Sequence, residues 1–443
     1  MPVDLLAWIS RLVNRDRNRV KARKKRLGNK DKTIKKLIRI IDRFMVPAVH
    51  KKATKQIEVL LTELNDQEVR KLNKVTVMGF SRLFLEKQMI EPASSLLSRY
   101  IHVSRIDQLL YFLEPLVELY GSGAFRGEPL GNFCASFQSP FSVNALDLLN
   151  REYRPVNESD RRNFQRFIIE PLCALAKNEK NLMDIRFSPS QRSDLRRVIK
   201  ASVSEERPLS LLRLGDGEAY PYQSPRVEGI ESIVFENDDI NFERSRTHWG
   251  VSPPPGNARE DLIMRFRQAV AQCDILGIPS VYRIIRNMVH PYSNYGTRRN
   301  QRAFIRILNA LGKDIPIEQK LFTEERCTRI RGAIDEAFLV DLATIARSVL
   351  LVSCWPNIQS KFPVKSSLIL VPASGKELFK IYPEIVERVR AASRPGTIVL
   401  VGAGVPAKIM VHEARQSGAV ALDVGSLLDY MVEQKTRTIA DLI

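Results

Sequence analysis

Short apolar runs alternate with amphipathic segments along the second half of the chain. The runs expected to form strands lie at residues 209–215, 274–279, 349–354, 367–373, 397–404 and 419–425. Between them, apolar residues recur every three or four positions, which predicts helices. These helices are expected within residues 259–273, 300–312, 336–348, 383–393 and 407–417. Continuous apolar strands that alternate with helices predict an α/β domain, with a mostly parallel sheet covered by helices on both faces.

The earlier part of the chain has a helical pattern. Apolar positions at helical spacing lie within residues 33–49, 57–72, 107–123 and 159–182. A further helix is expected after Ser188, its predicted cap, with Pro189 as the first helical residue. Residues 121–143 are rich in Gly, Ser, Pro and Phe, so we expect a long loop or a domain seam there.

The length of 443 residues predicts two or three domains. We expect a basic amphipathic segment at residues 1–45, an all-α domain of unknown role at 46–200 and an α/β domain at 201–443. The last of these is within the usual size range of a single domain.

Positive charge is concentrated near the N-terminus. Residues 11–43 hold 15 Lys and Arg against three Asp, a local net charge of +12 within a chain total of +19. Residues 5–13, which include Trp8, place several apolar side chains near one helical face directly before this run. An apolar face beside cations is typical of an anchor on an anionic membrane surface, through residues 1–43. A solvated basic helix is the alternative interpretation, and nucleic acid is the least favoured partner.

The cysteines and the apolar segments bear on location. Five scattered cysteines form no CxxC pair, which favours neither a disulfide framework nor a zinc ribbon. No stretch reaches the roughly 18–20 apolar residues that span a bilayer, and the N-terminus does not resemble a secretory signal. We therefore expect a cytoplasmic protein, peripheral on the inner membrane surface if the basic segment binds lipid.

A short acidic loop follows the first predicted strand of the α/β domain. Gly215 and Gly217 let the backbone turn sharply, and they flank Asp216, with Glu218 next. Two carboxylates two residues apart can share one divalent cation, and hard oxygen ligands suit Mg²⁺ or Mn²⁺. Arg213, just before the loop, is suited to contact phosphate. The alternative is a surface turn, because Gly-Asp-Gly is common turn chemistry.

A glycine-rich loop follows the 397–404 strand. Gly402, Gly404 and Ala407 match the spacing of the dinucleotide fingerprint, and Asp423 lies at the end of the next strand. This motivates an NAD-dependent oxidoreductase as a rival hypothesis. Only 20 residues follow Asp423, so we instead expect the last β-α-β unit of the domain. Its helix N-terminus is suited to an anionic group such as a nucleotide phosphate.

Three segments together resemble the GT-D-type glycosyltransferases: the Arg213–Glu218 loop, residues 370–386 and the Gly402–Gly425 unit. The resemblance covers roughly residues 205–430. It implies a Rossmann-like domain that transfers a sugar from a nucleotide-sugar donor, usually a UDP-sugar. It also implies a divalent metal held by an Asp-x-Glu motif, which corresponds to Asp216 and Glu218.

The chain departs from this family at Ser426, where many members carry a histidine. Asp423 and Asp429 lie near the same strand end and are expected to substitute in part.

Further candidates are supported only by their position or type. An acceptor site is expected near Asp238, Asp239, His248 and Trp249, an anion site near Arg298, Arg299 and Arg302, and nucleotide contacts at Trp355 and Asn357. Each of these groups has a structural or solvated role as its alternative.

The sequence therefore predicts a metal-dependent glycosyltransferase that acts on a glycan, glycoprotein or cell-surface polymer. The NAD-dependent oxidoreductase and a non-catalytic scaffold built on a degenerate transferase domain remain as alternatives.

Overall fold

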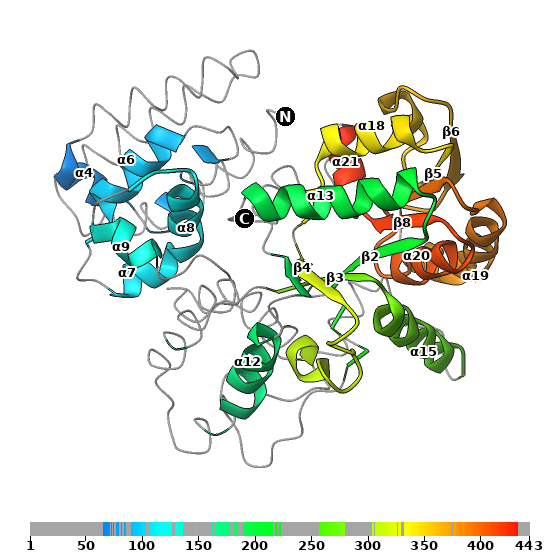
Figure 1. Ribbon diagram of the computed structural model, residues 1–443, viewed down its shortest axis with the longest axis horizontal. Coiled ribbons are helices and arrows are strands. Elements are labelled where there is room, and N and C mark those ends of the chain that lie inside the picture. The colour runs from blue at the N-terminus through cyan, green and yellow to red at the C-terminus, as the bar shows by residue number, and fades with distance from the viewer. Residues whose placement is uncertain are drawn as a thin grey trace, which may run out of the picture. The chain divides into compact units, whose positions relative to one another are not determined.

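Figure 1 shows the computed structural model of the chain. The structure describes residues 65–70, 72, 74, 77–78, 81, 84–85, 90–102, 106–125, 129–135, 147, 162, 165–177, 181–183, 189–215, 218–219, 221–222, 257–279, 304, 306–325, 327–328, 332–373 and 375–432. The predicted basic segment at 1–45 lies outside these residues, as does Ser188. The chain divides into two compact units, residues 1–132 with 433–443, and residues 133–432.

The first unit is helical in its described part. Its helices are α4 (Asp66–Arg70), α6 (Ile90–Tyr100), α7 (Ile106–Tyr111) and α8 (Leu113–Gly121), and α9 (Pro129–Ala135) crosses the boundary between the units. The helical prediction within residues 107–123 is confirmed. Of the two alternatives predicted at 121–143, the long loop is wrong over α9, because Leu130 and Cys134 lie one helical turn apart and are both buried. The Gly and Pro content of this stretch masked that spacing. The boundary between the two compact units falls within this stretch, after residue 132.

The second unit is built on a parallel sheet of eight strands in the described residues, in the order β1-β4-β3-β2-β8-β7-β5-β6. The strands are β1 (Leu182–Met183), β2 (Leu209–Arg213), β3 (Ile275–Ile278), β4 (Leu321–Glu324), β5 (Ser348–Ser353), β6 (Ser366–Leu370), β7 (Thr397–Val401) and β8 (Val420–Asp423). All six predicted strands are confirmed, while β1 and β4 were not predicted.

Helices cover both faces of this sheet (Figure 1). On one face lie α13 (Pro189–Ser204), α18 (Glu336–Ile345) and α21 (Leu427–Met431); on the other lie α15 (Asn257–Gln272), α19 (Gly375–Ala392) and α20 (Ala407–Gln416). The shorter η2 (Gln165–Ile169), α12 (Glu170–Ala176) and η4 (Pro356–Lys361) also belong to this unit. The helices predicted near α15, α18, α19 and α20 are confirmed, as is Pro189 as the first residue of α13.

Strand residues alternate between the two layers of the core. Leu211 of β2 packs in the same hydrophobic cluster as Leu195 of α13 and Phe338 of α18. Its neighbour Leu212 is equally buried but lies outside that cluster, because successive side chains of a strand point to opposite faces. Both faces of the sheet are therefore buried, as its continuous apolar strands require. This confirms the predicted Rossmann-like α/β architecture.

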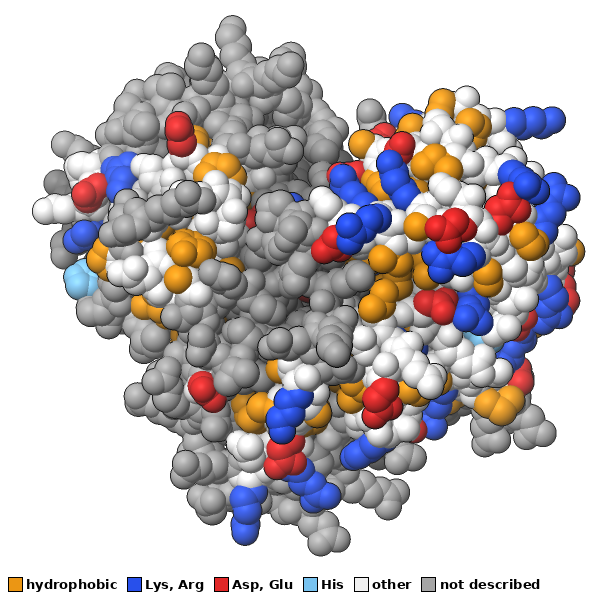
Figure 2. Space-filling view, in the orientation of Figure 1, with side chains coloured by type: hydrophobic (Ala, Val, Ile, Leu, Met, Phe, Trp, Pro, Cys, Tyr) orange, Lys and Arg blue, Asp and Glu red, His pale blue; other side chains and the backbone are white. Residues whose placement is uncertain are grey.

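The described surface and helices add two observations. Figure 2 shows acidic and basic side chains interspersed over the visible face of the second unit. None of the helices within the described residues is both long and apolar enough to cross a bilayer.

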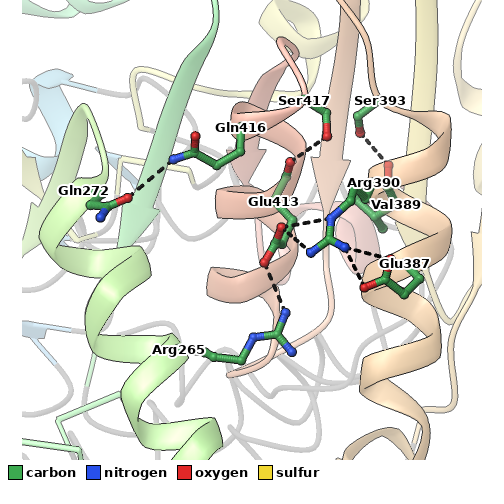
Figure 3. A network of polar contacts seen from close by, with 9 residues as sticks. All are labelled: Arg265, Gln272, Glu387, Val389, Arg390, Ser393, Glu413, Gln416 and Ser417. Atoms are coloured by element: carbon green, nitrogen blue, oxygen red, sulfur yellow. Dashed lines mark hydrogen bonds and ion pairs between the residues drawn. The ribbon is translucent and has the colours of Figure 1, made fainter.

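One carboxylate joins the three helices on the α20 face (Figure 3). Glu413 of α20 accepts a hydrogen bond from Arg265 of α15 at 3.1 Å and from Nη2 of Arg390 of α19 at 2.8 Å. Burial by itself would raise the pKa of Glu413, but the two arginines lower it below its ordinary value. Glu413 therefore links α20 to both α15 and α19 through charged hydrogen bonds.

We expect Glu413→Gln to reduce the free energy of unfolding by about 1 kcal/mol at neutral pH, because the charged hydrogen bonds are partly exposed. A lowered pKa means that this contribution is present above the ordinary glutamate pKa and is lost as the pH falls through the folded-state value. Urea unfolding of both proteins should therefore show a gap that shrinks below about pH 4.3. Glu387→Gln, on the exposed side of Arg390, should show almost no gap. A gap that stays constant down to pH 3 would contradict this account.

Candidate active site

The site is centred on the carboxyl ends of two adjacent strands. Arg213 is the last residue of β2 and Asp423 the last of β8, and the two strands pair in parallel. Arg213 donates from Nη2 to Oδ1 of Asp423 at 3.3 Å and from Nε to its backbone oxygen at 3.0 Å. Ligands of open α/β sheets bind beyond this edge. Both residues were predicted as site residues, and the structure brings them into direct contact.

Lys408 joins this pair to the acidic loop. Its Nζ lies 2.8 Å from Oε1 of Glu218 and 2.9 Å from Oδ2 of Asp423. Lys408 is in the first turn of α20, directly after the loop that contains Gly402 and Gly404. The two motifs that the sequence presented as rival sites are therefore parts of one site. Lys408 was not predicted as a site residue; the available signal was a lysine among apolar residues at the start of the helix after a strand.

Glu218 folds back over the start of its own loop. Its Oε2 accepts a hydrogen bond from the backbone N–H of Gly215 at 3.0 Å, and its side chain is 19% exposed. A Cβ at Gly215 would lie 3.1 Å from that oxygen, so the close approach favours glycine. Asp216 and Gly217, predicted as a metal ligand and a loop glycine, lie outside the described residues.

Glu325 is a second residue that the sequence analysis did not identify. It directly follows β4, its side chain is buried, and its backbone oxygen accepts from Nη1 of Arg213 at 3.4 Å. Its Oε2 would lie 3.5 Å from a Cβ at Gly215, so the carboxyl group reaches the base of the acidic loop. The described cluster thus contains three carboxyl groups and only two cations, Arg213 and Lys408.

Charge pairing dominates the ionisation of this cluster. Burial by itself would raise the pKa of Asp423, but Lys408 and Arg213 lower it below its ordinary value. Burial would likewise lower the pKa of Lys408, yet Asp423 and Glu218 raise it. All of these shifts favour the charged forms, so Lys408 is an ammonium and Asp423 a carboxylate at neutral pH.

Gly425 makes room for the Arg213 guanidinium. A Cβ built at Gly425 would overlap Nη2 of Arg213, and the residue has φ +51°. Gly404 has a similar φ of +60°, but a Cβ there would meet no atom within 4 Å. An alanine at Gly404 would therefore introduce backbone strain alone, whereas an alanine at Gly425 would introduce the same strain and also displace Arg213.

We expect Gly404→Ala to cost about 1 kcal/mol of unfolding free energy, from the left-handed backbone alone. Gly425→Ala should cost about 3 kcal/mol, because it also displaces Arg213 from its pairing with Asp423. Thermal unfolding of the two variants measures the difference. Equal losses would mean that Arg213 moves aside at no cost.

In this structure Asp423 pairs with cations of the protein, which does not fit the role that the NAD interpretation gives it. A dinucleotide site uses the acidic residue after the second strand to bind the ribose hydroxyl. Here the Asp423 side chain is only 2% exposed, and its two oxygens face Arg213 and Lys408. In the structure it pairs with a buried lysine and a partly buried arginine.

Four other residues named from the sequence follow β5 and β8: Trp355 and Asn357, and Ser426 and Asp429. Trp355 donates from its indole Nε1 to Asp429 at 2.7 Å, which links the segment after β5 to α21. Asn357 is exposed in η4, and Ser426 is the N-cap of α21 without a side-chain capping bond. The predicted residues of segments 223–256 and 280–303 lie outside the described residues; they are Asp238, Asp239, His248, Trp249, Arg298, Arg299 and Arg302.

The described residues fit one part of a metal site. In the part of the chain that the structure describes, no group of three or more His, Cys, Asp and Glu could hold a metal ion. Glu218 is nevertheless a suitable hard ligand, because a carboxylate has about four acceptor positions and it accepts only from Lys408 and Gly215 in the described structure. Mg²⁺-type sites commonly use one or two carboxylates together with substrate phosphates. Glu218 with Asp216 matches that pattern.

Comparison with known proteins identifies the domain. Residues 191–431 match the model of the GT-D fold-like domain, which is more than half of the chain. Two solved structures are also similar, at TM-scores of 0.36 and 0.34, and each comparison covers 60% of this chain and 86% of the other. One is the selenomethionine form of domain of unknown function 1792, at 17% identity, and the other is that domain described as having a distinct glycosyltransferase fold, at 16%. No curated protein matches the chain. On the strength of the family match, the chain belongs to the GT-D-like family.

Proposed function

We propose that this chain is a metal-dependent glycosyltransferase, which moves a sugar from a nucleotide-sugar donor, expected to be a UDP-sugar, to a hydroxyl of a glycan, glycoprotein or cell-surface polymer. Membership of the GT-D-like family supports a glycosyltransferase. The observation that carries the proposal is the position of Glu218, whose carboxylate lies beside Lys408 at the start of the helix after the glycine loop. The acidic loop and the glycine loop thus meet at the carboxyl edge of the sheet, where ligands of open α/β sheets bind.

In this proposal, Asp216 and Glu218 would hold Mn²⁺ or Mg²⁺. The bound cation supplies positive charge that offsets the charge developing on the leaving diphosphate. Arg213 contributes fixed positive charge at the same edge, since Asp423 holds its guanidinium in place. The N-terminus of α20 carries the positive end of the helix dipole, which suits a nucleotide phosphate, while the N–H groups of residues 407–410 already donate to the backbone oxygens of Gly404, Val405 and Pro406. Gly404, with open space where a Cβ would be, lets a phosphate approach the backbone.

Thermal unfolding with added ligands distinguishes this proposal from its alternatives, because a ligand that binds only the native state raises its stability. We expect UDP with Mn²⁺ to raise the melting temperature, and Asp216→Ala to remove that rise. A rise with NAD alone would favour the oxidoreductase. Absence of a rise with either nucleotide would favour the non-catalytic scaffold.

A further inference from the structure

Two buried lysines of the second unit have contrasting environments. Lys320 directly precedes β4, at the amino edge of the sheet, and donates to the backbone oxygens of Cys273 and Ala271. Lys408 is at the opposite edge, is equally buried, and pairs with the carboxylates of Glu218 and Asp423. Lys320 therefore satisfies backbone oxygens, 47 and 49 residues away in sequence, whereas Lys408 connects two side-chain carboxylates.

A contribution to stability alone does not explain why Lys408 is buried at this position. Burying an ammonium has a large desolvation cost, and replacing a buried ion pair by apolar side chains is often neutral or stabilising. The neighbouring helix positions Ala407, Ile409 and Met410 are buried and apolar, but the Lys408 side chain faces the carboxylates of Glu218 and Asp423. What an apolar residue would not provide is a donor to Glu218.

Lys408 fixes the direction of the Glu218 carboxylate. One oxygen of Glu218 faces Nζ of Lys408, and the other accepts from the backbone N–H of Gly215. With both oxygens held, the Glu218 side chain has a defined orientation relative to Gly215 and Lys408. Asp423 in turn pairs with Lys408, and retains Arg213 as a second partner.

We propose that Lys408 is a positioning residue, which holds Glu218 in the orientation that a divalent cation requires and so couples the acidic loop to the glycine loop. The cation part of this inference rests on the proposed function, whereas the ordering of the loop does not. Outer partners that orient metal ligands typically change metal affinity about 10–100-fold when they are removed.

Three variants of the full chain test this role: Lys408→Met removes the charge at similar length, Lys408→Arg retains it, and Lys320→Met is the matched control for losing a buried lysine. The first measurement is hydrogen exchange of the peptide that contains the Gly215 amide, without any ligand. The second is the dissociation constant of Mn²⁺ alone, from electron paramagnetic resonance titration. Lys408→Gln, which keeps a donor without the charge, replaces the Met variant if that variant does not fold.

We expect Lys408→Met to speed exchange of the Gly215 amide and to weaken Mn²⁺ binding, each by about tenfold or more. Lys408→Arg should restore most of both, and Lys320→Met should change neither, even if its melting temperature falls as far. Unchanged exchange in Lys408→Met would overturn the positioning role. Unchanged Mn²⁺ binding would overturn its effect on the cation, and tighter binding would show that Lys408 competes with the cation. If the unsubstituted protein binds no Mn²⁺, the proposed function fails, while the exchange result still decides the role of Lys408 in the loop.

Discussion

Replacing Asp423 with asparagine is expected to lower the free energy of unfolding by about 3–5 kcal/mol, the loss typical of removing one partner from a buried ion pair. Asp423 is the only carboxylate that the described structure places against both Lys408 and Arg213. Asparagine has nearly the same shape, so the cavity effect is small and the loss measures the charge. The cations Lys408 and Arg213 would remain at the sheet edge, and Lys408 would retain Glu218 as a paired carboxylate.

Urea-induced unfolding measures this loss, provided that the dependence of the unfolding free energy on urea concentration is the same in both proteins. Asp274→Asn is the matched control. Asp274 also pairs with an arginine, Arg415, and accepts from Ser210, but the two paired side chains are 28% and 29% exposed. Its loss should be about 1–2 kcal/mol, because water screens the pair and can solvate the remaining charge. Equal losses in the two variants would mean that the Asp423 cluster is not held by buried charge.

Glu218→Gln is expected to reduce the rate of donor turnover by about 100-fold or more, a loss comparable to removing one group that stabilises charge in the transition state. The amide retains the shape and an acceptor oxygen, but it is a poor ligand for a hard cation and does not neutralise Lys408. The release of UDP from a UDP-sugar, with water as acceptor, measures the rate. The fold should survive, since Asp423 still pairs with Lys408.

Asp429→Asn is the control for this experiment. Asp429 is near the same edge, but one of its oxygens accepts from the Trp355 indole. An asparagine oxygen can accept the same bond, so we expect a change in rate of less than about threefold. If Asp429→Asn instead abolished turnover while Glu218→Gln did not, the metal ligand would have to be sought at Asp429.

The strands of the second unit could be predicted where they are continuous apolar runs. β7 and β8 are continuous apolar runs between loops, and both were found with only their carboxyl ends placed too far along the chain. β4 was missed because its four residues end in Glu324 and are flanked by Lys320 and Glu325, which gives the segment a polar composition. Its place in the sheet comes from pairing with β3 and β1, which are distant in sequence.

The candidate site could be predicted only from its local motifs. Arg213, Glu218 and Asp423 were identified because each follows or ends a predicted strand. Lys408 and Glu325 were not, because their relation to the acidic loop arises from the order of β4, β3, β2 and β8 in the sheet. The contacts of Asp423 with Lys408 and Arg213 depend on the same strand order. Spacing matched a ribose-binding acid, while the fold surrounds it with Lys408 and Arg213.

The most direct test of the proposed function is a hydrolysis screen across nucleotide sugars, in which water replaces the unknown acceptor. We predict that the chain releases UDP from at least one UDP-sugar in the presence of Mn²⁺ or Mg²⁺, that chelation stops the release, and that Asp216→Ala abolishes it. Release that is indifferent to chelation and to Asp216→Ala, or no release from any nucleotide sugar, would contradict a metal-dependent glycosyltransferase.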